Sequence, residues 1–164
     1  NDLKGKRLMA FVVGSKRMTN RWPIEYFDEV IKNVMERTDL TPVLIGGSED
    51  NALVDKLNQK AVSFCGKLTP LESAELFRRC ILTLTNDTGP MHLSYAVGTK
   101  VIALFNARDF QQKWYPSEEL GVVFRDNKID CRLCYKEYCG HLSCLKNIKS
   151  ENIINKIKKF KGVV

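Results

Sequence analysis

Short apolar runs alternate along the chain with segments whose apolar residues recur at helical spacing. The run 8–14 is apolar up to its final glycine, which is typical of a strand buried on both faces of a parallel sheet. Segment 23–35 has helical spacing, and its opening proline is tolerated in a first turn. The same alternation predicts further strands over 42–47, 61–66, 81–85, 100–105 and 121–124, and further helices over 49–60, 71–80, 90–97 and 150–160.

This alternation, with connections of a few residues, predicts an α/β fold: a Rossmann-like, doubly wound parallel sheet of about six strands. The 164 residues suffice for one domain with a core and not comfortably for two, so we expect a single domain over 1–164. Two parts stand out, an irregular cysteine-containing excursion over 106–149 and a closing basic helix over 150–164. In the common strand order 3-2-1-4-5-6, ligands bind at the carboxyl ends of the first and fourth strands, where the order reverses.

The loop after the first predicted strand, residues 14–22, is rich in basic groups. It brings Lys16, Arg17 and Arg21 to the expected ligand end of the sheet. Basic groups facing a helix N-terminus suit a diphosphate leaving group, because negative charge builds on it as its bond breaks. The alternative is a solvated basic loop. Trp22 is interpreted as a packing anchor rather than a stacking platform.

The loop after the fourth predicted strand, residues 86–92, crosses from a strand end into a helix start. Thr88 or Asp87 can cap that helix, and Gly89 lets a ligand approach the backbone. The free N–H groups and the helix dipole make an anion site suited to a diphosphate, and His92 lies where it can hydrogen-bond a phosphate. The alternative is an ordinary capped helix with a surface histidine.

Other nucleotide-binding signals are weaker. Glu49 follows the second predicted strand, where an acidic residue often binds ribose hydroxyls, although the helix dipole alone also favours a glutamate there. The sequence has no Gly-x-Gly-x-x-Gly and no Gly-x-x-x-x-Gly-Lys-Ser/Thr, which disfavours dehydrogenase and P-loop functions. It has no Asp-x-Asp either, so a metal-bound diphosphate is not indicated.

The formal net charge of +7 is concentrated at one end of the chain. The last twenty residues hold six lysines and one glutamate, so the rest is nearly neutral. A nucleic-acid-binding protein would more often carry basic residues over a whole docking face, so we expect no nucleic-acid partner. The basic tail is the solvated side of a helix or, alternatively, a contact with an anionic membrane surface. We expect no membrane span, because no apolar run approaches the roughly 18–20 residues required, and no secretory signal in the polar opening residues.

Six cysteines are present, and four of them cluster within the excursion. Cys65 and Cys80 stand alone in apolar segments and are expected to be buried. Because no secretory signal is seen, we expect a cytoplasmic protein with reduced thiols. The cluster can supply four thiolates to a structural metal, but its spacing is tighter than in most zinc ribbons, and free or locally paired thiols are the alternative. Its members are Cys131, Cys134, Cys139 and Cys144.

These segments together resemble the ADP-heptose:lipopolysaccharide heptosyltransferase family, glycosyltransferase family 9. The resemblance rests on 14–23, on Gly46-Gly47-x-Glu49, on 64–69 and above all on 86–92, and both 96–105 and the cysteine-rich loop fit the same pattern. It extends over nearly the whole chain but matches only the C-terminal half of the family.

The resemblance implies one half of a GT-B fold, in which two Rossmann-like domains face each other. The C-terminal domain binds the nucleotide-sugar donor, and the N-terminal domain binds the lipid-linked glycan acceptor and carries the general base. This chain would then be the donor-binding domain of an inverting, metal-independent enzyme. That enzyme would transfer heptose or a related sugar from an ADP-sugar or another nucleoside-diphosphate sugar to lipopolysaccharide core or a related glycan. No catalytic base is expected in this chain, which alone should be inactive.

The resemblance also implies a set of donor-binding residues. Asp87, Thr88, Gly89 and His92 would contact the diphosphate and sugar. Glu49 would contact the ribose, and Thr69 would lie near the adenine. The full candidate set is Ser15, Lys16, Arg17, Asn20, Arg21, Gly47, Glu49, Thr69, Asp87, Thr88, Gly89, Pro90 and His92.

The sequence departs from the family pattern at two positions. Asn20 stands where the family usually has a lysine expected to meet the donor phosphates, so either Lys16 or Arg17 replaces it or the donor differs from ADP-heptose. Leu133 stands where a proline is common. A stand-alone nucleotide-binding or cysteine–metal interaction module without transferase activity remains the alternative function. A cytoplasmic location, peripheral at the inner face of the membrane, fits the transferase.

Overall fold

Six parallel strands form one sheet in the order β3-β2-β1-β4-β5-β6. This computed structural model describes residues 3–160. The strands are β1 (Arg7–Val12), β2 (Leu40–Leu44), β3 (Val62–Ser63), β4 (Cys80–Asn86), β5 (Lys100–Leu104) and β6 (Gly121–Phe124). All six predicted strands and the predicted strand order are confirmed, so β1 and β4 flank the point where the order reverses.

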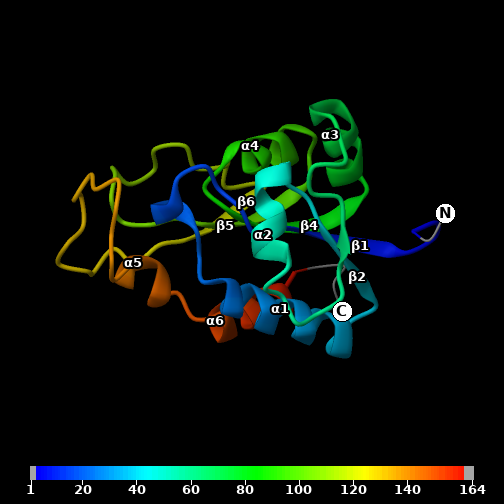
Figure 1. Ribbon diagram of the computed structural model, residues 1–164, viewed down its shortest axis with the longest axis horizontal. Helices are drawn as coiled ribbons and strands as arrows, with labels where there is room; N and C mark the ends of the chain where they lie inside the picture. The colour runs from blue at the N-terminus through cyan, green and yellow to red at the C-terminus, as the bar shows by residue number, and fades with distance from the viewer. Residues whose placement is uncertain (1–2, 161–164) are drawn as a thin grey trace.

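Helices cover both faces of the sheet (Figure 1). They are α1 (Ile24–Arg37) and α6 (Ser150–Ile157) on one face, and α3 (Pro70–Arg78) and α4 (Gly89–Ala96) on the other. Helix α1 buries Phe27, Val30, Ile31 and Val34, a spacing that lines one helical face. Their burial against the sheet fixes the start of α1 and thereby the loop that leads into it from β1. Within the described residues, no helix combines the length and the apolar character needed to cross a membrane.

The helix predicted over 49–60 is wrong beyond its first turns. The structure has a 3-10 turn η2 (Ser48–Asp50) and a short helix α2 (Asn51–Val54). The backbone N–H groups of Asn58 and Gln59 donate to the Asp28 carboxylate on α1, at 2.9 and 3.0 Å. Because this tertiary contact replaces helical hydrogen bonds, the chain leaves the helix early.

The excursion predicted over 106–149 is not one irregular stretch. The predicted strand β6 pairs with β5 inside it, and a short helix α5 (Ser143–Lys146), which the pattern did not predict, lies near its end. A second element that the pattern did not predict is the 3-10 turn η1 (Met18–Asn20) in the loop after β1. In the basic segment 150–164, α6 is followed by a turn, and residues 161–164 lie outside the described residues.

Candidate functional site

The loops after β1 and β4 meet at the carboxyl end of the sheet, as predicted. Ser15 Oγ donates to the Asp87 carbonyl oxygen at 3.3 Å. Asn20 Nδ2 donates to the same carbonyl at 3.2 Å and to Asp87 Oδ2 at 3.0 Å. Arg21 Nε donates to the Ser15 carbonyl at 2.7 Å and holds the first loop in a tight curve. Asn20, the position that departs from the family pattern, therefore ties the two loops together.

A buried asparagine at the end of β4 anchors this junction. Asn86 Nδ2 donates to the Val13 carbonyl at 2.8 Å, and Asn86 Oδ1 accepts from the Trp22 backbone N–H at 3.0 Å. Trp22 is only 2% exposed, and its Nε1 donates to the Ile148 carbonyl at 2.8 Å. The prediction that Trp22 is a packing anchor is confirmed. Both ends of the first loop are thus fixed to the core before any ligand binds.

A cleft of about 330 Å³ opens where the two loops meet, and we refer to it as the strand-end cleft. It is lined by Arg17, Asn20, Asp87, Thr88, Gly89, His92, Asn106, Arg108, Asp109 and Trp114. Thr88 occupies the N-cap position of α4, but no side chain makes a cap hydrogen bond there, so neither predicted cap forms. Gly89 has open space where a side chain would stand. The N-terminus of α4 is therefore open to an anion.

Charges of both signs surround the strand-end cleft. Arg17 and Arg108 bring positive charge, and Asp87 and Asp109 bring negative charge. Burial raises the pKa of Asp87, an effect that the nearby His92 and Arg17 oppose. A hydrogen bond from Lys113 holds the pKa of Asp109 below its usual range. A phosphate in the cleft would meet two guanidinium groups beside a carboxyl whose charged form is disfavoured.

His92 lies in the first turn of α4 with its ring fixed by neighbours. Its Nδ1 is 2.8 Å from the Tyr95 hydroxyl oxygen, and its ring meets the Trp114 ring edge-on at 6.2 Å between centroids. Within residues 3–160 no hydrogen bond to His92 Nε2 is found, so that nitrogen is available to a ligand in the strand-end cleft.

Several predicted donor-binding residues do not line the strand-end cleft. Ser15 and Arg21 shape its first loop, and Lys16 is exposed beside it. Thr69 caps α3, where its hydroxyl accepts from the Glu72 N–H at 3.3 Å. The remaining residues of this group are Gly47, Glu49 and Pro90. Their donor contacts stay predictions.

The residues that follow β5 were not among the predicted site residues. Asn106 Nδ2 donates to the Thr19 carbonyl and to Asn20 Oδ1, each at 2.7 Å, and so joins a third loop to the first two. Arg108 and Trp114 reach the strand-end cleft from the same segment. The signal that would have found them is strand order, because the carboxyl end of β5 lies beside that of β4.

A second missed residue is Asp50, next to the predicted Glu49. Asp50 is buried, and its Oδ2 accepts from the Gly47 N–H at 3.1 Å. A Cβ at Gly14 would stand only 1.8 Å from Asp50 Oδ1, so this approach requires glycine. Burial raises the pKa of Asp50. Gly14 and Gly46, which follow β1 and β2, therefore leave room for the Asp50 carboxyl group.

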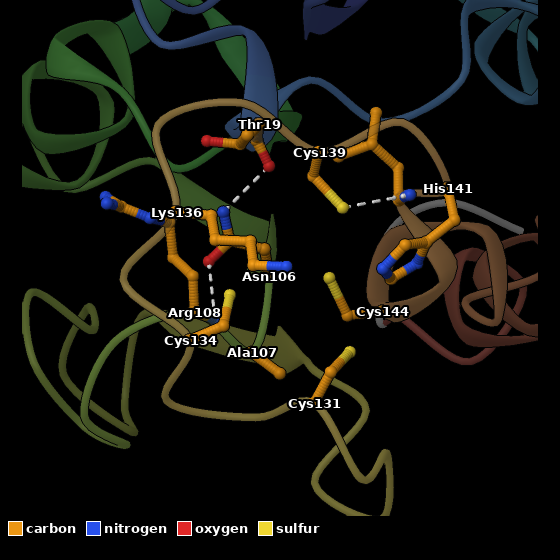
Figure 2. Close-up of a pocket in the computed structure, with 11 residues that line it drawn as sticks. Thr19, Asn106, Ala107, Arg108, Cys131, Cys134, Lys136, Cys139, His141 and Cys144 are labelled. Atoms are coloured by element: carbon orange, nitrogen blue, oxygen red, sulfur yellow. Dashed lines mark hydrogen bonds between the residues drawn. The ribbon is translucent and has the colours of Figure 1, made fainter.

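The four clustered cysteines line one small cavity of about 20 Å³, the cysteine cavity. Figure 2 shows the sulfur atoms of Cys131, Cys134, Cys139 and Cys144 turned toward a common space. All four are free thiols. Burial raises the pKa of Cys144, and Cys131 and Cys139 raise it further. As the side chains stand, the described residues include no group of three or more His, Cys, Asp or Glu that could hold a metal ion.

The two isolated cysteines are buried, as predicted. Burial raises the pKa of Cys80 to about 12, and its thiol lies 3.2 Å from the Leu76 carbonyl oxygen. Cys65 is likewise held in its thiol form by burial, which raises its pKa. Both thiols act as small core residues.

Comparison with known proteins finds curated relatives and solved structures that match nearly the whole of this chain. Two lipooligosaccharide heptosyltransferases 2 from strains of Campylobacter jejuni are 27% and 28% identical and match 94% of this chain. Among solved structures, a glycosyltransferase family 9 protein from Veillonella parvula is 28% identical, with a TM-score of 0.74 over 92% of this chain and 44% of that one. The E. coli ADP-heptose LPS heptosyltransferase II is 19% identical, with a TM-score of 0.75 over 93% of this chain and 46% of that one.

A third solved structure shares the fold at lower identity. The dodecameric iron-containing heptosyltransferase TibC, in complex with ADP-D-β-D-heptose, is 16% identical, with a TM-score of 0.70 over 94% of this chain and 45% of that one.

The chain spans about half the length of the curated relatives that it matches, 52% and 51% for the Campylobacter pair. A family model described as glycosyltransferase family 9 (heptosyltransferase) matches residues 1–143. The match covers most of the chain, including both loops of the strand-end cleft. The chain therefore belongs to glycosyltransferase family 9, the heptosyltransferase family.

Proposed function

We propose that residues 1–164 form the donor-binding domain of a glycosyltransferase that transfers heptose or a related sugar from a nucleoside-diphosphate sugar to lipopolysaccharide core or a related glycan. The observation that carries the proposal is the meeting of Arg17, Arg108 and the open N-terminus of α4 in one cleft. The relatives named above as heptosyltransferases, and the TibC complex with ADP-D-β-D-heptose, support an ADP-sugar as the donor.

The main chemical requirement on the donor side is to stabilise the charge of the leaving diphosphate. As the bond between sugar and diphosphate breaks, negative charge accumulates on the nucleoside diphosphate. The two arginines and the first-turn N–H groups of α4 stabilise that charge, and His92 Nε2 donates to a phosphate oxygen. Asn20 brings no charge to the phosphates and is occupied with Asp87 and Asn106. Arg17 and Arg108 therefore replace the family lysine, and Lys16 stands farther out.

The nucleoside half of the donor extends over the neighbouring loops in this proposal. Glu49 contacts the ribose, and Thr69 lies near the adenine, with Ser15, Lys16, Arg21, Gly47 and Pro90 around them. The Gly66 N–H donates to the Gly46 carbonyl at 3.0 Å, so the loops after β2 and β3 lie together at the same end of the sheet as the strand-end cleft. This adjacency supports the placement.

Transfer itself requires a second domain. In the proposed inverting reaction, a base in the N-terminal acceptor domain removes the proton of the acceptor hydroxyl, whose oxygen attacks the sugar carbon as the diphosphate leaves. Asp87 is tied to Asn20 on the donor side, so it is not the base. Two guanidinium groups supply the positive charge that the diphosphate needs, which supports metal-independent transfer with no added cofactor. The chain alone is expected to bind the donor without transferring sugar.

The alternative function, a stand-alone nucleotide-binding or cysteine–metal interaction module, centres on the cysteine cavity. TibC is described as iron-containing. As placed here, Cys131, Cys134, Cys139 and Cys144 do not fit a metal ion, and no step of the reaction runs through one. Elemental analysis decides the matter: about one zinc or iron per chain would support a structural metal, and freely titrating thiols without metal would eliminate it.

A cytoplasmic location, peripheral at the inner face of the membrane, is part of the proposal. Six free thiols suit a reducing compartment. The partners are then the nucleotide sugar, the acceptor domain and the lipid-linked glycan, with no nucleic acid.

Calorimetric titration with a panel of nucleotides and nucleotide sugars tests the proposed function. ADP and an ADP-sugar should bind, and raising the salt concentration should weaken both because charge supplies much of the affinity. A chain that binds none of the nucleoside diphosphates, or that transfers sugar without a second domain, would contradict it.

A further inference from the structure

One exposed carboxylate from the cysteine-bearing segment 131–144 reaches both arginines of the strand-end cleft. Glu137 Oε2 accepts from Arg17 Nε at 3.0 Å, and Glu137 Oε1 accepts from Arg108 Nη2 at 2.9 Å. Arg17 belongs to the loop after β1, and Arg108 to the segment after β5. A single side chain thus links three loops around the place where the diphosphate is proposed to bind.

The backbone holds Glu137 in this position. The Leu133 N–H donates to the Ala107 carbonyl at 2.7 Å, and the Tyr135 N–H donates to the Arg108 carbonyl at 3.0 Å. Arg108 Nη2 also donates to the Tyr135 carbonyl at 2.7 Å. Segment 131–144 is therefore docked along the chain after β5. Hydrogen bonding from Arg17 and the charge of both arginines hold the pKa of the Glu137 carboxyl below its usual range, so it stays charged at neutral pH.

The two arginines have capacity that Glu137 does not use. The Arg108 side chain is 10% exposed, and its Nε is buried with no hydrogen-bond partner among the described residues. Arg17, Arg108 and Glu137 together carry one net positive charge. Of the other two carboxyl groups in the cleft, Asp109 pairs with Lys113 at 2.9 Å, and burial disfavours the charged form of Asp87. A diphosphate carries more negative charge and more acceptor oxygens than a carboxylate, so it competes well for the same donors.

We propose that Glu137 is a positioning residue that holds Arg17 and Arg108 in the donor-free state and is displaced from them by the diphosphate of the donor. The inference rests on the proposed function for the identity of the donor. In this role Glu137 has two effects. Its carboxylate lowers the affinity of the cleft for the diphosphate, and the same carboxylate pairs with the arginines again when the nucleoside diphosphate leaves. It also couples occupancy of the strand-end cleft to the segment that carries the four clustered cysteines.

The test compares wild type, Glu137→Gln and Asp130→Asn by calorimetric titration with ADP and with inorganic pyrophosphate, at low and moderate salt. Asp130→Asn is the matched control, because it removes the same charge from an exposed position in the same excursion. Glu137→Gln should bind both ligands roughly two- to fivefold more tightly than wild type, the range expected when a solvent-exposed competing ion pair is removed. Its affinity should also fall more steeply with salt. Asp130→Asn should match wild type.

If Glu137 had only a structural role, replacing it would leave the affinity for ADP and pyrophosphate unchanged or would weaken it. Unchanged or weaker binding by Glu137→Gln, in a protein whose thermal melting matches wild type, would overturn the inference. Glu137→Asp guards against a folding defect, because it keeps the charge and loses reach, and its affinity should lie between those of wild type and Glu137→Gln. Wild type that binds pyrophosphate but not ADP would contradict the proposed function alone, since the comparison of variants with pyrophosphate still decides the role of Glu137.

Discussion

The strand-end cleft and the cysteine cavity are neighbours that share Asn106 and Arg108, yet they are built in different ways. The cleft is an open space of about 330 Å³ at the ends of β1, β4 and β5, where charged side chains flank a helix N-terminus. The cavity is a space of about 20 Å³ formed mainly by irregular chain and lined by thiols. In the cleft, the backbone N–H groups at the start of a regular helix form part of the anion site, whereas the cavity is lined by side chains of irregular chain.

Trp22 supports both regions, so its loss should have the largest effect. Its side chain holds the loop of the strand-end cleft to the core and donates to Ile148, just after α5. Trp22→Ala should lower the free energy of unfolding by about 3–5 kcal/mol, the usual range for a buried tryptophan. Urea unfolding measures this. Trp114→Ala, at a tryptophan that is 63% exposed, is the control and should change stability by less than about 0.5 kcal/mol.

His92 belongs to the strand-end cleft alone. His92→Ala should weaken ADP binding roughly ten- to hundredfold, because losing a hydrogen bond to a charged group typically costs about 1.5–3 kcal/mol. Cys131→Ser, which alters only the cysteine cavity, should leave ADP affinity within about threefold of wild type. Calorimetric titration of the three proteins separates the two regions. Equal ADP affinity in wild type and His92→Ala would show that α4 does not bind the diphosphate.

Trp114 lines the strand-end cleft beside His92, and we expect it to contact the sugar of the proposed donor. The residue is 63% exposed and its ring meets the His92 ring edge-on, so we expect it to stack on the sugar rather than on the nucleotide. Trp114→Ala should therefore weaken ADP-sugar binding roughly two- to tenfold, from about 0.5–1.5 kcal/mol of aromatic contact, and leave ADP binding unchanged. Parallel titrations with ADP and ADP-sugar check this, and an equal loss for both ligands would place Trp114 on the nucleotide.

Asp50→Asn should have the smallest effect, a change in how the free energy of unfolding depends on pH. Burial raises the pKa of Asp50 in the folded chain above its unfolded value, so the folded state takes up the proton first on acidification. This group thus adds stability as the pH falls through its folded pKa, and the contribution is complete below the unfolded value of about 3.9. Asp50→Asn removes it. The stability of the variant relative to wild type should be highest at neutral pH and should fall toward pH 4 in urea unfolding, and a constant difference would contradict this.

The contrast between the two regions also explains what the sequence could predict. The strands followed from apolar runs and their order from the common topology of doubly wound sheets, so the meeting of the loops around Asp87 and Asn20 was foreseeable. Arg108, Trp114 and Glu137 lie in segments without periodicity, and no local pattern indicates which of them face the strand-end cleft. The helix expected over 49–60 was wrong because Asp28, distant in sequence, binds the backbone of Asn58 and Gln59. Such side-chain contacts between distant segments have no signature in the local sequence.

A crystal structure of this chain grown with ADP would show whether the diphosphate binds in the strand-end cleft. We expect diphosphate oxygens within hydrogen-bonding distance of the first turn of α4 and of Arg17 or Arg108, with Glu137 released from at least one arginine. ADP bound elsewhere on the chain, with the strand-end cleft unchanged and Glu137 still paired with both arginines, would contradict it.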